Sequence, residues 1–140
     1  MIKRTKKSAN AKVRNATPNI VDGIRFLSKL ESYCYKALKE AGIEAEYEPH
    51  SYILLEPFKY NGESIRKMSY KPDFVGDGFI IECKGMMTET FPLRWKMFKW
   101  YLFRNNIEVD LYLPRNQKQV NEVIQKIKDK INGRQELLPT

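Results

Sequence analysis

The apolar run Phe79-Ile80-Ile81 constrains the fold of this 140-residue chain more than any other feature. Three apolar residues in a row show no alternation between an apolar and a polar face. A run of this kind is typical of a strand that is covered on both sides, so it predicts a central buried strand. Hydrophobic residues make up 42% of the chain, which is enough for one compact domain with a modest core.

Periodicity and capping signals predict the elements around this strand. Three helices are expected, at about Ser28–Ala41, Pro92–Asn105 and Gln117–Ile131, with Gly42 and Gly133 ending the first and the last. Extended segments are expected at Ala45–Glu48, Ser51–Phe58, Ser64–Tyr70, around Asp73, at Phe79–Lys84 and at Val109–Leu113. Asn61-Gly62 predicts a hairpin, and the crossover through the second helix makes the last two strands parallel. The order predicts an α/β fold with a mixed sheet flanked by helices.

Charged residues follow directly after the apolar run. Because side chains alternate between the faces of a strand, Glu82 and Lys84 point to one side and Cys83 to the other. Asp73 precedes the run, and Gly76-Asp77-Gly78 provides turn residues that can bring its strand back alongside. Two carboxylates on one surface suit a hard divalent ion, Mg²⁺ above all, and a lysine beside it can orient an attacking water. The pattern predicts metal-assisted phosphodiester hydrolysis.

A solvated outer face is the alternative interpretation, since acidic and basic residues two apart are common on the exposed side of a strand. The neighbouring apolar run argues against it. Charged groups at the end of a buried strand cost desolvation free energy unless something compensates them, and a metal–phosphate site would do so.

Pro72-Asp73 followed by Glu82-x-Lys84 resembles the signature of the PD-(D/E)xK nuclease superfamily. The segments Ser28–Glu31 and Gly42–Glu48 resemble the start of the phage endonuclease I group of Holliday-junction-resolving enzymes, in which a helix-borne glutamate precedes the PD motif. Two further segments, Val21–Phe26 and Lys84–Thr88, resemble small phage and prophage proteins of the same superfamily. Together the similarities span roughly Val21 to Phe103.

The resemblance implies a restriction-endonuclease-like mixed β-sheet flanked by helices, an α-β-β-β-α-β core plus a C-terminal helix. It implies a metal-dependent endodeoxyribonuclease, structure-selective or junction-processing, that serves phage or prophage DNA recombination. The implied catalytic residues are Glu31, Asp73, Glu82 and Lys84. Mg²⁺, which Mn²⁺ can replace, would be held by Asp73, Glu82 and the backbone carbonyl of Cys83. Glu31 would order a second ion or its water shell.

Two local features leave alternatives open. Ser28 and Glu31 also form a capping-box pattern, in which Glu31 would reach back to the backbone N–H of Ser28. In the resolving enzymes the segment before the PD motif is exchanged between subunits, whereas Asn61-Gly62 favours a hairpin that folds back on its own chain. The hairpin puts subunit exchange, and with it junction resolution, in doubt, and leaves homodimer formation open.

The net charge of +8 is unevenly distributed. Residues 1–16 carry six of these charges and no acidic residue, at Lys3, Arg4, Lys6, Lys7, Lys12 and Arg14. We therefore expect a flexible basic arm over residues 1–17 and a single nuclease domain over residues 18–140. The arm would contact the phosphates of branched or duplex DNA, as would Arg94, Lys96 and Lys99 of the second helix. A solubilising tail or an address signal is the alternative for the arm, and a non-catalytic nucleic-acid-binding module is the alternative for the whole protein.

Other classes of protein do not fit the chain. No apolar run approaches membrane-spanning length and no secretory segment follows Met1, so we expect a cytoplasmic protein of a bacterial host or phage-infected cell, without a membrane partner. Cys34 and Cys83 are expected to be reduced and buried. One histidine and two separated cysteines exclude a zinc cluster. Trp95, Phe98 and Leu102 are expected to be core residues.

Overall fold

The computed structural model describes residues 17–137 and has an α/β fold. The expected mixed sheet with flanking helices is confirmed. The basic residues predicted for the arm, Lys3 to Arg14, lie outside the described residues. Within residues 17–137, no helix is both long enough and apolar enough to cross a membrane.

Four short strands form the central sheet, in the order β10-β9-β8-β3. They are β3 (Ala45–Tyr47), β8 (Phe74–Gly76), β9 (Phe79–Ile81) and β10 (Asp110–Tyr112). Strand β8 is antiparallel to both β3 and β9, whereas β9 and β10 are parallel. The crossover between β9 and β10 contains helix α3 (Phe91–Arg104), as the sequence predicted. Each side chain of β9 is at most 5% exposed, which confirms the buried central strand.

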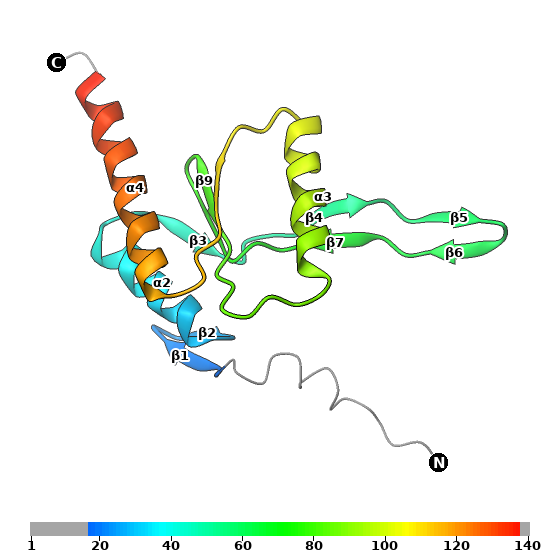
Figure 1. Ribbon diagram of the computed structural model, residues 1–140, viewed down its shortest axis with the longest axis horizontal. Helices are drawn as coiled ribbons and strands as arrows, with labels where there is room; N and C mark the ends of the chain where they lie inside the picture. The colour runs from blue at the N-terminus through cyan, green and yellow to red at the C-terminus, as the bar shows by residue number, and fades with distance from the viewer. Residues whose placement is uncertain (1–16, 138–140) are drawn as a thin grey trace.

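Alternating residues of the sheet belong to two hydrophobic clusters, one on each face of the sheet. Phe79 and Ile81 of β9 pack with helices α2 (Lys29–Glu40) and α4 (Gln117–Leu137). Ile80 packs on the other face with α3. Figure 1 shows α2 and α4 near each other and well apart from α3. The predicted buried residues of α3, namely Trp95, Phe98 and Leu102, lie in the second cluster.

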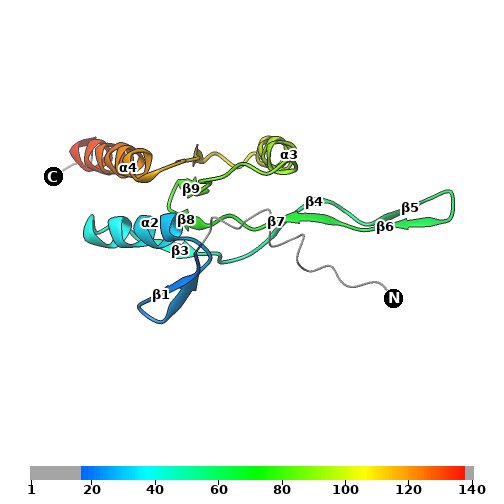
Figure 2. The same ribbon diagram turned by 60° about the horizontal axis from the view of Figure 1, so that its bottom comes forward.

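A long β-hairpin projects away from this body (Figures 1 and 2). Strands β4 (Tyr52–Leu55) and β7 (Met68–Tyr70) pair at its base, and β5 (Phe58–Tyr60) and β6 (Glu63–Ile65) pair at its tip. At the tip Asn61 and Gly62 both have positive φ, 48° and 81°, as a type I′ turn requires. The hairpin predicted from Asn61-Gly62 is confirmed. The two long strands expected there are each interrupted, because Pro57 cannot donate to the ladder and the register shifts beside Leu54.

The structure adds one element that was not predicted and corrects two boundaries. A hairpin not predicted from the sequence, β1 (Asn19–Val21) and β2 (Ile24–Phe26), precedes α2, with a positive-φ turn at Asp22-Gly23. Helix α4 runs through Gly133 to Leu137, since the roughly 1 kcal/mol cost of one helical glycine is offset by the helix-forming residues after it. Regular strand β9 ends at Ile81 rather than at Lys84.

Candidate active site

The register of β8 and β9 brings the predicted acidic residues to one end of the sheet. Phe74 of β8 pairs with Ile81 of β9. Asp73 directly precedes Phe74 and Glu82 directly follows Ile81, so the two carboxylates leave the sheet side by side. An Asp73 carboxylate oxygen accepts a hydrogen bond of 2.8 Å from the backbone N–H of Cys83, which fixes its orientation. Each of the two carboxylate residues is only 6% exposed, so the solvated-face interpretation is wrong for them.

The chain after β9 remains extended and keeps the predicted alternation of faces. The N–H groups of Glu82 and Lys84 donate to the carbonyls of Tyr112 and Pro114, at 2.9 and 3.1 Å, and so continue the parallel pattern past β10. Lys84 Nζ lies 3.8 Å from Glu82 Oε2. The side chain of Cys83 points into the cluster on the other face of the sheet.

Helix α2 packs against this segment through a hydrophobic cluster that includes Cys34. Cys34 is fully buried in the same cluster as Cys83, and both thiols are free. A hydrogen bond with Cys34 and burial raise the pKa of the Cys83 thiol well above its usual value. Glu31 lies about one turn before Cys34. This shared packing places the helix that carries Glu31 against the chain segment that carries Glu82.

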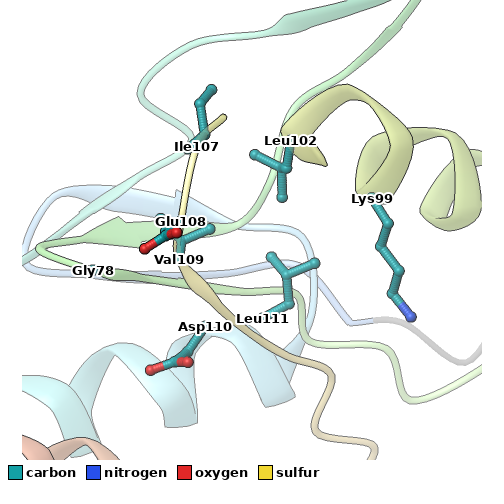
Figure 3. Close-up of a pocket in the computed structure, with 8 residues that line it drawn as sticks. All are labelled: Gly78, Lys99, Leu102, Ile107, Glu108, Val109, Asp110 and Leu111. Atoms are coloured by element: carbon teal, nitrogen blue, oxygen red, sulfur yellow. The ribbon is translucent and has the colours of Figure 1, made fainter. Parts of the chain in front are cut away.

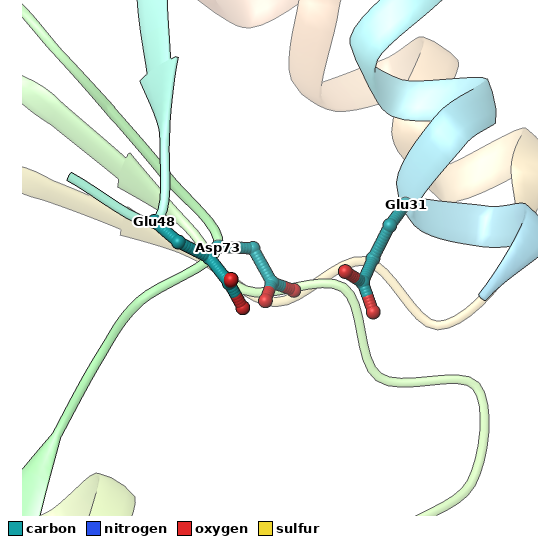
Figure 4. A group of neighbouring side chains, drawn as sticks. All are labelled: Glu31, Glu48 and Asp73. Atoms are coloured by element: carbon teal, nitrogen blue, oxygen red, sulfur yellow. The ribbon is translucent and has the colours of Figure 1, made fainter. Parts of the chain in front are cut away.

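The carboxylates of Glu31, Glu48 and Asp73 converge at the end of the sheet where β8 begins. One oxygen of each lies within 4.8 Å of one oxygen of both others. In Figure 4 the Glu31 side chain extends from α2 toward the carboxylates of Asp73 and Glu48, which project side by side from the end of the sheet. Glu82 is not part of this group of three, although it is close enough to raise the pKa of Asp73.

Sequence reasoning did not identify Glu48 as a site residue. Tyr47 pairs with Phe74 in the antiparallel register of β3 and β8, so the next residue along β3 faces Asp73. The Glu48 N–H donates to the Asp73 carbonyl at 2.8 Å, and Glu48 has a positive φ of 47°. Left-handed backbone is uncommon outside glycine and clusters at functional sites. The signal that could have found Glu48 is the pairing of β3 with β8.

Two tyrosine hydroxyls orient two of the glutamates. Tyr47 Oη donates to Glu31, and Tyr70 Oη donates to Glu82 at 2.5 Å. Tyr70 itself is only 5% exposed, in the cluster under α3. Burial and the neighbouring carboxylates raise the pKa of both tyrosines, so both remain protonated donors. Each glutamate is therefore held by a rigid donor before any ligand arrives.

Glu31 also takes part in capping α2, but through the Ser28 hydroxyl rather than through the predicted bond from the Ser28 backbone N–H to its carboxylate. Its N–H donates to Ser28 Oγ at 3.2 Å, and the Ser28 hydroxyl donates to its carboxylate at 3.2 Å. The second carboxylate oxygen receives the Tyr47 hydroxyl. Capping and a place in the acidic group are thus compatible for this residue.

The electrostatics of the site favour protonated carboxyls. Burial is the largest cause that raises the pKa of Glu31, of Asp73 and of Glu82, the last to about 7. Mutual repulsion adds to it: Glu82 and Glu31 raise the pKa of Asp73, and Glu48 raises that of Glu31. Within residues 17–137, Lys84 is the basic side chain that forms an ion pair with this group. The site therefore has more negative groups than positive ones.

This donor set fits a hard divalent cation. Mg²⁺ takes oxygen ligands at about 2.1 Å, so two ligands on opposite sides of the ion lie about 4.2 Å apart. At most one pair of three ligands can be opposite, and neighbouring ligands lie about 3.0 Å apart, so the oxygens of Glu31, Glu48 and Asp73, within 4.8 Å of one another, would move closer together on binding the ion. The cation would also supply the positive charge that the buried carboxylates lack. Coordination by the backbone carbonyl of Cys83 stays a prediction.

The predicted basic residues of α3 differ in their surroundings. Arg94 is partly buried and donates to the backbone carbonyl of Ser69, which fixes it against β7. Lys96 and Lys99 are exposed, and Lys99 lines a shallow groove with Gly78, Leu102 and Asp110 (Figure 3). Gly78 lies in the β8–β9 turn, at the opposite end of these strands from Asp73. The groove is therefore separate from the acidic group.

Residues 11–123 match the model of a family described as a protein of unknown function (DUF1064). This match covers most of the chain, so the protein belongs to that family. Searches of curated proteins and of solved structures gave no match.

Proposed function

We propose that this member of the DUF1064 family is a metal-dependent endodeoxyribonuclease that hydrolyses DNA phosphodiester bonds. The observation that carries the proposal is the buried acidic group at the end of β8 and β9, with Lys84 beside it. Asp73 and Glu82 are each 6% exposed, and burial of this kind costs free energy unless a cation compensates it. A buried group of like charges lowers the stability of a folded domain, which supports a functional reason for it.

Asp73, Glu31 and Glu48 would hold Mg²⁺, and Glu82 would complete the site from the next strand. When bound, the ion polarises the phosphate and lowers the pKa of a coordinated water. The Cys83 N–H fixes one oxygen of Asp73 and leaves the other available. Tyr47 and Tyr70 fix the rotamers of Glu31 and Glu82, so little reorganisation accompanies ligand binding.

Lys84 and Glu82 would position the attacking water. Lys84 Nζ and Glu82 Oε2 are 3.8 Å apart, and hydrogen bonds of about 2.8 Å to each allow one water to bridge them. The ammonium group also lies 4.6 Å from the ring centroid of Phe91, an interaction that restricts the flexible lysine side chain. In this position the ammonium can also stabilise negative charge that develops on the phosphate.

DNA is the proposed substrate, and a branched form of it in particular. The resemblance to phage resolving enzymes and to small phage and prophage nucleases supports a structure-selective, junction-processing role in recombination. Paired incisions need two sites, and because the Asn61-Gly62 hairpin pairs within its own chain, we propose a homodimer formed without the subunit exchange of the resolving enzymes. Sedimentation of the protein with and without four-way DNA tests the dimer independently of the chemistry.

The nuclease is tested on linear, nicked, forked and four-way DNA with Mg²⁺. Asp73→Asn and Lys84→Ala should lower cleavage by at least about a thousandfold, as the loss of preorganised electrostatic groups does, while the melting temperature does not fall. Asp77→Asn and Lys126→Ala are matched controls, because both residues are exposed and lie away from the acidic group, and they should cleave normally. Full activity in Asp73→Asn would remove the proposed site. Binding without cleavage by the unmodified protein, on every substrate, would favour a nucleic-acid-binding module.

A further inference from the structure

Helix α3 uses only one side for the core. Phe91, Trp95, Phe98 and Leu102 face the sheet and the base of the long hairpin, and each is at most 9% exposed. These residues account for the apolar stripe that an ordinary surface helix needs. Large apolar residues on the other side of the helix are therefore not explained by the fold.

The solvent-facing side of α3 nevertheless carries three such residues. Leu93 is 56% exposed, Trp100 is 53% exposed and Phe103 is 74% exposed. Positions 93, 96, 100, 103 and 104 recur at three- and four-residue spacing, so they form one stripe along the helix. The rings of Trp100 and Phe103 are neighbours, with centroids 5.8 Å apart and planes at 34°. We call residues 93, 96, 100, 103 and 104 the outer stripe.

The charge of α3 identifies the kind of partner. The helix contains four basic residues, Arg94, Lys96, Lys99 and Arg104, and no acidic residue. Lys96 lies in the outer stripe between Leu93 and Trp100, and Arg104 lies next to Phe103. A second copy of the chain is a poor occupant, because a two-fold contact would place this cationic face against itself. A polyanion with flat apolar groups complements both the charge and the rings.

Helix α3 links the outer stripe to the candidate active site, although the two lie on opposite sides of the helix. Lys84 contacts the Phe91 ring at the first turn of α3. Trp100 lies nine residues further along the helix, which is about 13.5 Å at 1.5 Å per residue. A strand whose phosphate lies at Lys84 would pass around the first turns of α3 to reach Trp100 and Phe103 on the outer side of the helix.

We propose that the outer stripe of α3 binds unpaired, single-stranded DNA, with Trp100 and Phe103 stacking on bases and Lys96 and Arg104 contacting phosphates. Stacking on aromatic side chains tolerates any sequence, and it requires bases that are already unstacked from a duplex. The inference rests on the proposed nuclease function and specifies its substrate as DNA with a single-stranded branch, flap or junction arm. The stripe supplies the structure selectivity that the acidic group alone lacks.

Binding is measured with the Asp73→Asn protein in EDTA, so that neither cleavage nor metal affects the result. The probes are a fluorescein-labelled oligothymidylate, a blunt duplex and a forked duplex. Trp100→Ala and Phe103→Ala should each weaken oligothymidylate binding by about tenfold or more, the size expected for one stacked base. Blunt-duplex binding should change little. Tyr60→Ala is the matched control, since Tyr60 is 64% exposed at the tip of the hairpin, away from α3, and it should bind as the parent does.

Tryptophan fluorescence gives a second measurement. Trp95 is in the core and Trp100 is exposed, so quenching by oligothymidylate should occur in the parent protein and be lost in Trp100→Phe. Unchanged oligothymidylate affinity in both alanine variants overturns the proposal, as does an equal loss on blunt duplex. Stronger quenching by anionic lipid vesicles than by oligothymidylate would instead assign the stripe to a membrane surface and also overturn it. Absence of cleavage on every DNA would overturn the nuclease but leave these binding results unaffected.

Discussion

Replacing Glu82 with glutamine should stabilise the metal-free protein at neutral and alkaline pH. Burial raises the pKa of Glu82 from 4.5 to about 7 in the folded protein. Because the folded-state pKa is the higher one, the buried carboxyl favours its protonated form. Its ionisation therefore lowers the free energy of unfolding as the pH rises from about 4.5 to 7, and below this window it has no effect. Glutamine cannot ionise, and its carbonyl oxygen can still accept the Tyr70 hydroxyl.

The magnitude follows from the same pKa. A rise from 4.5 to about 7 corresponds to about 3 kcal/mol, because one pKa unit equals about 1.4 kcal/mol. Glu82→Gln should thus be more stable than the parent by up to about 3 kcal/mol at pH 8 and nearly equal to it at pH 4.5. For a domain of this size the gain at pH 8 is a melting temperature higher by about 10 °C. Most substitutions of buried residues have the opposite sign.

The assay is thermal unfolding, followed by circular dichroism, from pH 4.5 to 8.5 in EDTA and again with millimolar Mg²⁺. Magnesium should raise the melting temperature of the parent most at high pH, since the ion binds the ionised carboxylates. Magnesium should raise the melting temperature of the variant less, so the difference in melting temperature between the two proteins becomes smaller. Asp77→Asn is the control, because this side chain is fully exposed, and its pH profile should follow the parent. A variant no more stable than the parent at pH 8 in EDTA would refute the reasoning.

Three further predictions follow from the site and the charge distribution. Glu48→Gln should weaken Mg²⁺ binding, measured by calorimetry, by about tenfold or more, and equal affinity would remove Glu48 from the metal ligands. Calcium should support DNA binding without efficient cleavage, because its larger shell fits the reactive geometry poorly, whereas Mn²⁺ should replace Mg²⁺; undiminished cleavage in excess EDTA would contradict the metal mechanism. Deletion of residues 1–16 removes six positive charges and should lower the slope of log K against log salt by several units, at about 0.9 per phosphate contact on duplex DNA; an unchanged slope would make the arm a tail or an address signal.

The sequence by itself determined the parts of the fold that depend on neighbouring residues. The apolar run Phe79-Ile80-Ile81 identified the buried central strand, and Ser28 and Gly42 bounded the first helix closely. Asn61-Gly62 identified the hairpin tip, because only a few residue types adopt its backbone conformation. Asp73, Glu82 and Lys84 could be placed together because the turn between their strands is short. In each case the structure depends on interactions between residues close together in the chain, so a short sequence pattern is enough to predict it.

The tertiary structure alone decided which distant groups meet. Glu48 joins Asp73 through the pairing of β3 with β8, and nothing in the local sequence around Glu48 distinguishes it from a solvated glutamate. Tyr70 reaches Glu82 because helix α3 and the base of the hairpin pack over the same face of the sheet. The exposed side of α3 likewise became visible only when the packing showed which of its aromatic residues the core uses. Pairing and packing join residues far apart in the chain, where the free energy depends on the whole arrangement and not on any short pattern.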